Sequence, residues 1–364
     1  MVFSKIVSGP TAAIATLLLT LTPVLGCADL YEPMQRRTFE HDGIDREYFV
    51  HEPKNVDGKL PVVFAIHGYS STATGFQAAH DLNHHADQHG YMVVYPQGTH
   101  FMAELEGQKP FRATTWNTFG VGEPNPDAGP QCAPDAAKYA CPPGCGVCGP
   151  CHWAPCTDDA GFFDRLLDAV EAEFETDSSR FYALGVSNGG MMVLRIGCDF
   201  SDRFAAIAPI VALLPAYHSC APANDLPIMF LAGGKDETVR IDGLPGKDDG
   251  FIYTRLDESA REWAESMHCK SGPEPWKNEL SSEAGLMCST YSDCRIDGHE
   301  VVSCVDPLGT HRWPAQRPQG PSATCVTPEQ HESMPGQGHC EARSEVGEHV
   351  GMDLVWSFFS RYRR

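Results

Sequence analysis

Continuous apolar runs alternate with amphipathic stretches along this chain. Residues 60–66 and 228–232 are apolar at nearly every position, which is typical of strands buried on both faces of a parallel sheet. Residues 159–174 instead place apolar side chains at helical spacing. Further strands are predicted at 46–50, 91–95, 181–184, 204–211 and 300–305, and further helices after 190, over 257–268 and near the C-terminus. This alternation predicts an α/β fold, with a doubly wound, mostly parallel sheet and helices on both faces.

One motif lies between a predicted strand and a predicted helix. Residues 185–190 read Gly-Val-Ser-Asn-Gly-Gly, which is a G-x-S-x-G pattern. Strand, tight turn and helix form the context in which this pattern is a nucleophile elbow. The glycines allow the sharp turn because they carry no Cβ atom. We therefore predict an α/β-hydrolase fold with Ser187 as a nucleophile at the carboxyl end of a strand.

An acidic partner should follow the serine in the chain, because α/β-hydrolases carry their triad in the order Ser, Asp or Glu, His. Asp236 comes directly after the predicted strand 228–232 and is the predicted acid. Glu237 and Asp242 are nearby alternatives. A carboxylate at this place can fix the histidine tautomer and stabilise the imidazolium that forms during the reaction.

The base must be chosen among 16 histidines. His311 lies on the loop after the last predicted strand, where a catalytic histidine normally stands, and is the predicted base. His339, a short distance before the C-terminal helix, is the alternative. His67 is expected to shape an oxyanion loop, and His84 and His85 are expected on a solvated helix.

A serine hydroxyl is a poor nucleophile unless a base accepts its proton, and the tetrahedral oxyanion needs fixed hydrogen-bond donors. The amide of Asn188, directly after the nucleophile, is predicted to be one donor. The second is predicted at Tyr69 or close to it, on the loop after the strand 60–66. No cofactor and no metal is needed for this chemistry.

The N-terminus has the features of an export signal, which we place at 1–27. Lys5 precedes an apolar, charge-free stretch over 11–21 that is too short for a confident membrane span. Val-Leu-Gly-Cys at 24–27 is similar to a lipobox, although Leu25 is bulky where a small residue is usual. Lipidation of Cys27 and ordinary cleavage with secretion therefore both remain open. Residues 28–364 are expected to form a single domain and a monomer.

The formal net charge of −21 indicates a surface that repels phosphate backbones. A nucleic-acid partner is therefore not expected. An ester attached to a polysaccharide or a polyester is the expected substrate.

Fifteen cysteines are present, and 14 remain to pair if Cys27 carries a lipid. Six of them lie in a Gly- and Pro-rich insert at about 100–157: Cys132, Cys141, Cys145, Cys148, Cys151 and Cys156. The spacing over 145–151 is also found in metal sites, but an exported Cys-dense loop favours disulfides. Outside the insert, the suggested pairs are Cys198 with Cys220, Cys294 with Cys304, and Cys325 with Cys340.

Several short motifs occur together in one order and resemble a known family. They are His-Gly at 67–68, Tyr-Pro-Gln-Gly at 95–98, Thr-Trp-Asn at 115–117, Asp-Asp-Ala-Gly-Phe at 158–162, the serine motif, Phe-Ala-Ala-Ile-Ala-Pro at 204–209 and Gly-Thr-His-Arg-Trp-Pro at 309–314. Together they resemble the esterases related to poly(3-hydroxybutyrate) depolymerases and feruloyl esterases, over roughly residues 40–360. The resemblance implies a secreted serine esterase whose nucleophile, acid and base match Ser187, Asp236 and His311. The Cys-rich insert and a second insert at about 315–345 depart from the family pattern.

Three functions follow as hypotheses. The first is a hydrolase of feruloyl or acetyl esters of plant polysaccharide, with Trp116, Trp153 and Trp313 as aromatic walls for the substrate. The second is a polyhydroxyalkanoate depolymerase. The third is a surface-binding protein on an inactive hydrolase scaffold, which the retained serine, acid and histidine disfavour.

Overall fold

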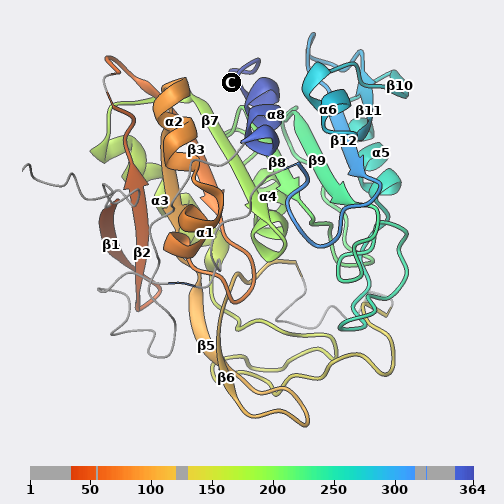
Figure 1. Cartoon of the computed structure of the whole chain (residues 1–364). Coiled ribbons are helices and arrows are strands. Elements are labelled where there is room, and N and C mark those ends of the chain that lie inside the picture. The colour runs from red at the N-terminus through yellow and green to blue at the C-terminus, as the bar shows by residue number, and fades with distance from the viewer. Residues whose placement is uncertain (1–33, 55, 120–129, 316–324, 326–348) are drawn as a thin grey trace, which may run out of the picture.

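The computed structural model describes residues 34–54, 56–119, 130–315, 325 and 349–364. These residues form a 10-stranded sheet and a separate two-stranded hairpin (Figure 1). In spatial order the strands of the sheet are β1 (Gln35–His41), β2 (Ile44–His51), β4 (Met92–Pro96), β3 (Leu60–Ile66), β7 (Thr176–Val186), β8 (Ala206–Ile210), β9 (Ile228–Gly233), β12 (Val301–Asp306), β11 (Met287–Ser292) and β10 (Ser271–Pro275).

The six central strands from β4 to β12 run parallel, and two antiparallel strands flank them on each side. The predicted mostly parallel sheet is therefore confirmed. The outer strands β1, β10 and β11 were not predicted, because their mixed polar sequences and partly exposed positions carry no continuous apolar run.

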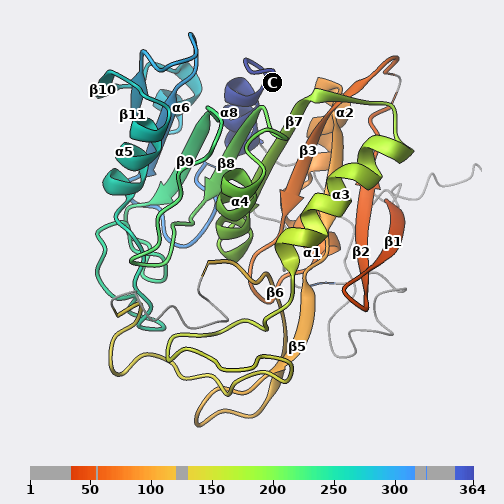
Figure 2. The ribbon, with the colours of Figure 1, turned by 180° about the vertical axis from the view of Figure 1, so that it is seen from behind.

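Helices cover both faces of the sheet. One face carries α1 (Ala73–His80), α2 (Leu82–His89), α6 (Glu279–Glu283) and α8 (Val350–Phe359), and the opposite face carries α3 (Asp159–Glu173), α4 (Asn188–Asp199) and α5 (Leu256–Ser266) (Figures 1 and 2). Alternate residues of each strand point to opposite faces. In β3, Phe64 therefore joins the core under α3 and α4, while Val63 joins the core under α1, α2 and α8. This double burial explains why the central strands are apolar throughout.

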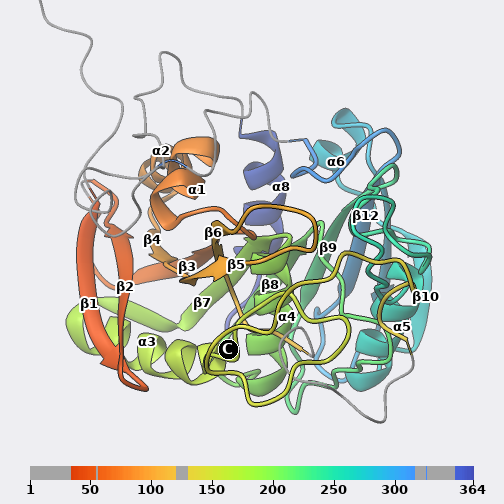
Figure 3. The same cartoon turned by 90° about the horizontal axis from the view of Figure 1, so that it is seen from below.

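A loop-rich segment at 99–158 lies at the carboxyl ends of the parallel strands (Figures 1 and 3). It begins with the hairpin β5 (Thr99–Ala103) and β6 (Phe111–Thr115), and its described remainder from 130 is largely irregular. Three disulfides cross-link it: Cys132–Cys151, Cys141–Cys148 and Cys145–Cys156. The disulfide interpretation of the six cysteines is confirmed.

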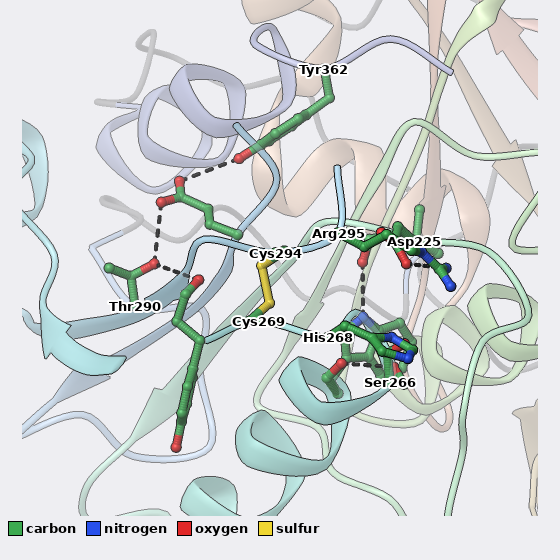
Figure 4. Close-up of a disulfide and its surroundings, with 12 residues drawn as sticks. Asp225, Ser266, His268, Cys269, Thr290, Cys294, Arg295 and Tyr362 are labelled. Atoms are coloured by element: carbon green, nitrogen blue, oxygen red, sulfur yellow. Dashed lines mark hydrogen bonds and ion pairs between the residues drawn. A yellow bond between two sulfur atoms is a disulfide. The ribbon is translucent and has the colours of Figure 1, made fainter. Parts of the chain in front are cut away.

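The Cys198–Cys220 pair is also confirmed, with Cα atoms 5.8 Å apart. The suggested pairing of Cys294 with Cys304 is wrong. Cys304 lies directly opposite Cys288 in the β11–β12 ladder and bonds to it. Cys294, just after β11, bonds to Cys269, just before β10, as Figure 4 shows. The disulfide partner of Cys304 is therefore the cysteine opposite it in the sheet, although Cys294 is closer to it in the sequence.

Two other predictions are affected by the structure. His85 is not solvated on its helix, because its side chain is completely buried under α8. Cys325 is disulfide-bonded, but Cys340 lies outside the described residues, as does nearly all of the predicted insert at 315–345 and the segment 1–27. No helix in the described part of the chain is long and apolar enough to cross a membrane.

Candidate active site

Ser187 occupies the sharp turn between β7 and α4. Its φ of 56° lies in the left-handed region, which is strained for a residue with a side chain. Neighbouring glycines make the turn sterically feasible: a Cβ atom on Gly189 would lie 2.2 Å from the carbonyl oxygen of Ile66. A Cβ atom on Gly185 would lie 2.5 Å from the backbone of Gly189. The local sequence thus forces the serine hydroxyl out at the carboxyl end of the central strand.

His311 stands between the serine and a carboxylate. Its Nε2 atom is 2.8 Å from Oγ of Ser187, and its Nδ1 atom is 2.7 Å from Oδ2 of Asp236. The acceptor on the Nδ1 side favours the tautomer with the proton on Nδ1. Nε2 is then left to accept the serine proton.

Asp236 is itself fixed in place just after β9. Its Oδ1 atom accepts backbone hydrogen bonds from Thr238 and Val239, each 2.9 Å long, and the residue is only 5% exposed. The alternative acids point elsewhere. Glu237 forms an ion pair with Lys247, and Asp242 accepts hydrogen bonds from Arg240.

His339, the alternative base, lies outside the described residues. Of the two candidate bases, the structure therefore places only His311, and it places it within hydrogen-bond distance of Ser187. The loop that carries it is held by Trp313, which is buried against Phe76 and His80 of α1.

The loop after β3 passes close to the serine. A Cβ atom on Gly68 would lie 3.4 Å from Cβ of Ser187. His67 is completely buried, and its Nε2 atom accepts a 2.9 Å hydrogen bond from the amide of Gly98. Its Nδ1–H therefore donates to the carbonyl oxygen of Gly68, at 2.8 Å. Burial lowers the pKa of His67 to about 4, so the ring is neutral at pH 7.

The Gly68–Tyr69 peptide is oriented by this hydrogen bond. In a trans peptide the carbonyl and the amide point in opposite directions. The His67 ring holds the carbonyl of Gly68, and the amide of Tyr69 is therefore directed to the other side of the loop. At the start of α4, the side chain of Asn188 is bonded to the backbone of Trp116 at 2.8 and 3.0 Å, which fixes the first turn of this helix.

A pocket of about 250 Å³ opens beside Ser187 and His311. Besides Ser187 and His311, its lining combines five aromatic residues, two other apolar residues and three polar residues: Tyr69, Tyr139, Trp153, Phe251, Tyr253, Met191, Val239, Asn188, Thr238 and Asp249. The rings of Tyr69 and Trp153 meet edge to face, with centroids 5.5 Å apart. Burial raises the pKa of Asp249.

Trp116 and Trp313, which we predicted to contact substrate, do not line this pocket. Trp116 is completely buried against Phe162 and Phe163 of α3, and its indole N–H donates to the carbonyl of His67. Both tryptophans therefore belong to the core, and we withdraw their assignment to substrate binding. Trp153, named with them as a possible wall, does line the pocket.

No protein-family model matches the chain. Among curated proteins it is 29% identical over 174 residues to feruloyl esterase B of Piromyces equi, which covers 45% of this chain and 30% of that protein. It is 25% identical to the putative esterase NocK of Nocardia uniformis, over 75% of this chain and 72% of that protein. It is 22% identical to poly(3-hydroxyalkanoate) depolymerase C of Paucimonas lemoignei, over 58% of this chain and 41% of that protein. The chain is thus similar in sequence to curated esterases, among them a feruloyl esterase and a polyhydroxyalkanoate depolymerase.

The resemblance inferred from the sequence motifs is thereby confirmed. The chain spans less than half the length of two of these three relatives. Among solved structures, acetyl xylan esterase from Aspergillus awamori matches with a TM-score of 0.47 and 13% identity, over 77% of this chain and 95% of that one.

Sequence reasoning missed most of the residues that line this pocket. Tyr139 comes from the disulfide-linked insert, and Phe251 and Tyr253 come from the loop between β9 and α5. Neither segment has a period of two or 3.6 that would show which side chains point inward. The isolated aromatic residues inside polar, irregular stretches were the available signal.

Proposed function

We propose that this chain is an exported serine carboxylic-ester hydrolase that works through an acyl-enzyme. Ser187 is the nucleophile, His311 the general base and Asp236 the residue that orients the base. The observation that carries this proposal is the continuous hydrogen-bonded series from Ser187 through His311 to Asp236, at 2.8 and 2.7 Å.

The reaction follows from this order of groups. Oγ of Ser187 attacks the ester carbonyl carbon while Nε2 of His311 takes the hydroxyl proton. When the tetrahedral intermediate collapses, the imidazolium returns this proton to the leaving alcohol, and the acyl group stays on the serine. A water molecule then attacks the acyl carbon, giving its proton to His311, and the acid is released with Ser187 restored.

The oxyanion formed in both steps needs two donors. We assign them to the amides of Asn188, the first residue of α4, and of Tyr69, on the loop after β3; both residues line the pocket beside Ser187. His67 is a positioning residue in this scheme, because its bond to the carbonyl of Gly68 sets the direction of the Tyr69 amide.

The pocket favours an aromatic acyl group. Aromatic walls from three separate segments suit a flat ring, and Asp249 offers a polar acceptor among them. This supports feruloyl esters of plant polysaccharide as the first substrate class, with acetyl esters as a smaller variant of the same chemistry. The alternative is a polyhydroxyalkanoate depolymerase, which the relative from Paucimonas lemoignei supports.

Export is the setting that fits the disulfides, because such bonds persist in oxidising compartments. The disulfides and the esterase relatives suggest an extracellular protein. Within that setting, a lipid anchor at Cys27 and plain secretion are both compatible with the sequence. We further propose a monomer that has no nucleic-acid partner.

A substrate panel tests the proposal. Methyl ferulate, acetylated xylan and polyhydroxybutyrate are offered to the purified protein, with the Ser187→Ala variant as the background. Fastest turnover of methyl ferulate supports the aromatic acyl pocket, and fastest release of hydroxybutyrate supports the depolymerase. Absence of hydrolysis of all three, in a protein folded by circular dichroism, would leave only the inactive binding protein.

A further inference from the structure

A second group of reactive side chains lies between α2 and α8, and none of its members lines the pocket of Ser187. The group consists of His85 and His89 on α2 and Asp353 on α8. We propose that these three residues bind a divalent transition-metal ion of the Zn²⁺ type. This site is independent of the proposed ester hydrolysis.

The donor atoms have the spacing that a metal ion requires. One ligand atom from each residue lies within 4.8 Å of the others. Nε2 of His85 is 3.1 Å and Nε2 of His89 is 3.9 Å from Oδ1 of Asp353. Zinc lies about 2.0–2.2 Å from nitrogen and oxygen ligands, so neighbouring ligands in a tetrahedral site are roughly 3.3 Å apart. The proposed site therefore requires the ring of His89, which is the more exposed histidine, to move toward Asp353.

The helix places the two imidazoles for joint binding. His85 and His89 are four residues apart, so they project from the same face of α2. Their rings are now stacked, with centroids 4.1 Å apart, so the His89 ring must turn before both Nε2 lone pairs point to one ion. Two histidines at this spacing on one helix, joined by a carboxylate from another element, form a ligand set that suits zinc and related ions.

The surroundings of His85 support a ligand role. Its Nδ1 atom is hydrogen-bonded to the hydroxyl of Tyr91 at 2.8 Å, which fixes the ring and leaves Nε2 directed at Asp353.

An ion can also reach the group. The side chain of His85 is completely buried, whereas those of His89 and Asp353 are 36% and 38% exposed. One side of the group thus faces water, which supplies the entry path and a fourth ligand. A bound ion would join α8, the C-terminal helix, to α2. The expected role is therefore structural.

Zinc titration of the full protein with matched variants tests this site. After chelator treatment and dialysis, Zn²⁺ is titrated against a competing indicator dye, and melting temperatures are recorded with and without Zn²⁺. The variants are His89→Ala and Asp353→Asn, with His84→Ala as the control. His84 lies on the same helix but outside the group, and it is bonded to Gln88.

We expect the parent protein and His84→Ala to bind one equivalent and to melt at a higher temperature with Zn²⁺. His89→Ala and Asp353→Asn should lose affinity by roughly 10- to 100-fold or more, and should lose the melting shift. Retained ester hydrolysis shows that these variants are folded. The proposal is overturned if the parent takes up no Zn²⁺, or if the two ligand variants bind it as tightly as the control.

Discussion

The sheet and the insert at 99–158 contribute different parts of the candidate active site, and each is held in place by different interactions. The sheet is held by two hydrophobic cores, and its strand ends carry Ser187, Asp236 and the loop of His311. The described part of the insert is largely irregular, and three disulfides hold it. From it come Tyr139 and Trp153, which form part of the pocket wall.

This difference suggests that the sheet and the insert have different functions in the candidate site. Groups that must be placed to within tenths of an ångström stand on the rigid sheet, where packing fixes their positions. Groups that choose the acyl chain stand on a segment whose shape is set by cross-links and can change without disturbing the core. Changes to the sheet residues should therefore affect turnover of every ester, and changes to the insert should affect selectivity.

The largest effect should come from the proposed base. His311→Ala should lower kcat on the order of 10⁴-fold for all esters, because no other placed group can accept the Ser187 proton. His339→Ala, the matched control, should leave kcat nearly unchanged. Steady-state kinetics of the two variants decide the matter. Loss of kcat in His339→Ala but not in His311→Ala would assign the role of base to His339. It would also contradict the claim that the ends of the sheet strands carry the catalytic groups.

The protein should also become less stable to unfolding at acidic pH, because His67, on the loop after β3, is buried in its neutral form. The folded pKa of His67 is about 4, below its unfolded value of about 6.5. Protonation therefore favours the unfolded chain, so this contribution is complete above pH 6.5 and is lost as the pH falls toward 4. The loss amounts to about 3 kcal/mol. Urea unfolding at pH 7 and pH 4 measures it. His67→Asn should show a smaller difference between the two pH values, and equal differences would refute the assignment.

Removal of a disulfide from the insert should have the next largest effect on the protein. Cys145→Ser with Cys156→Ser opens a disulfide between residues 11 positions apart, for which about 2–4 kcal/mol is typical. We expect this loss to loosen the insert and to reduce kcat/KM for aryl esters more than for acetyl esters. An equal loss of kcat/KM for aryl and acetyl esters would show that the insert supports the catalytic groups themselves.

A single wall residue should have the smallest and most selective effect. Trp153→Ala removes an indole that contacts Tyr69 and Phe251 in the pocket. One hydrophobic pocket contact is worth roughly 1–3 kcal/mol, so kcat/KM for methyl ferulate should fall about 10- to 100-fold. An acetyl ester serves as the internal control and should be little affected. Equal losses for both would place Trp153 in the structural core of the site.

The two regions also differ in how far the sequence predicts them. The central strands were predictable because burial on both faces leaves unbroken apolar runs such as 60–66. Ser187, Asp236 and His311 were nominated from chain order and strand ends, and in the structure His311 lies within hydrogen-bond distance of both other residues. Pairing inside the insert was not predictable, since six cysteines allow fifteen arrangements. Trp116 was misplaced because a tryptophan at a strand end gives the same sequence signal in a core as in a pocket.

The central claim is that Ser187, activated by His311, performs the chemistry. The most direct measurement is covalent labelling with an alkyl fluorophosphonate, followed by mass spectrometry of the digested protein. We predict one phosphonyl group per chain, located on Ser187, with none on the Ser187→Ala variant and much slower labelling of His311→Ala. A label on another residue, together with undiminished ester hydrolysis by Ser187→Ala, would contradict the account.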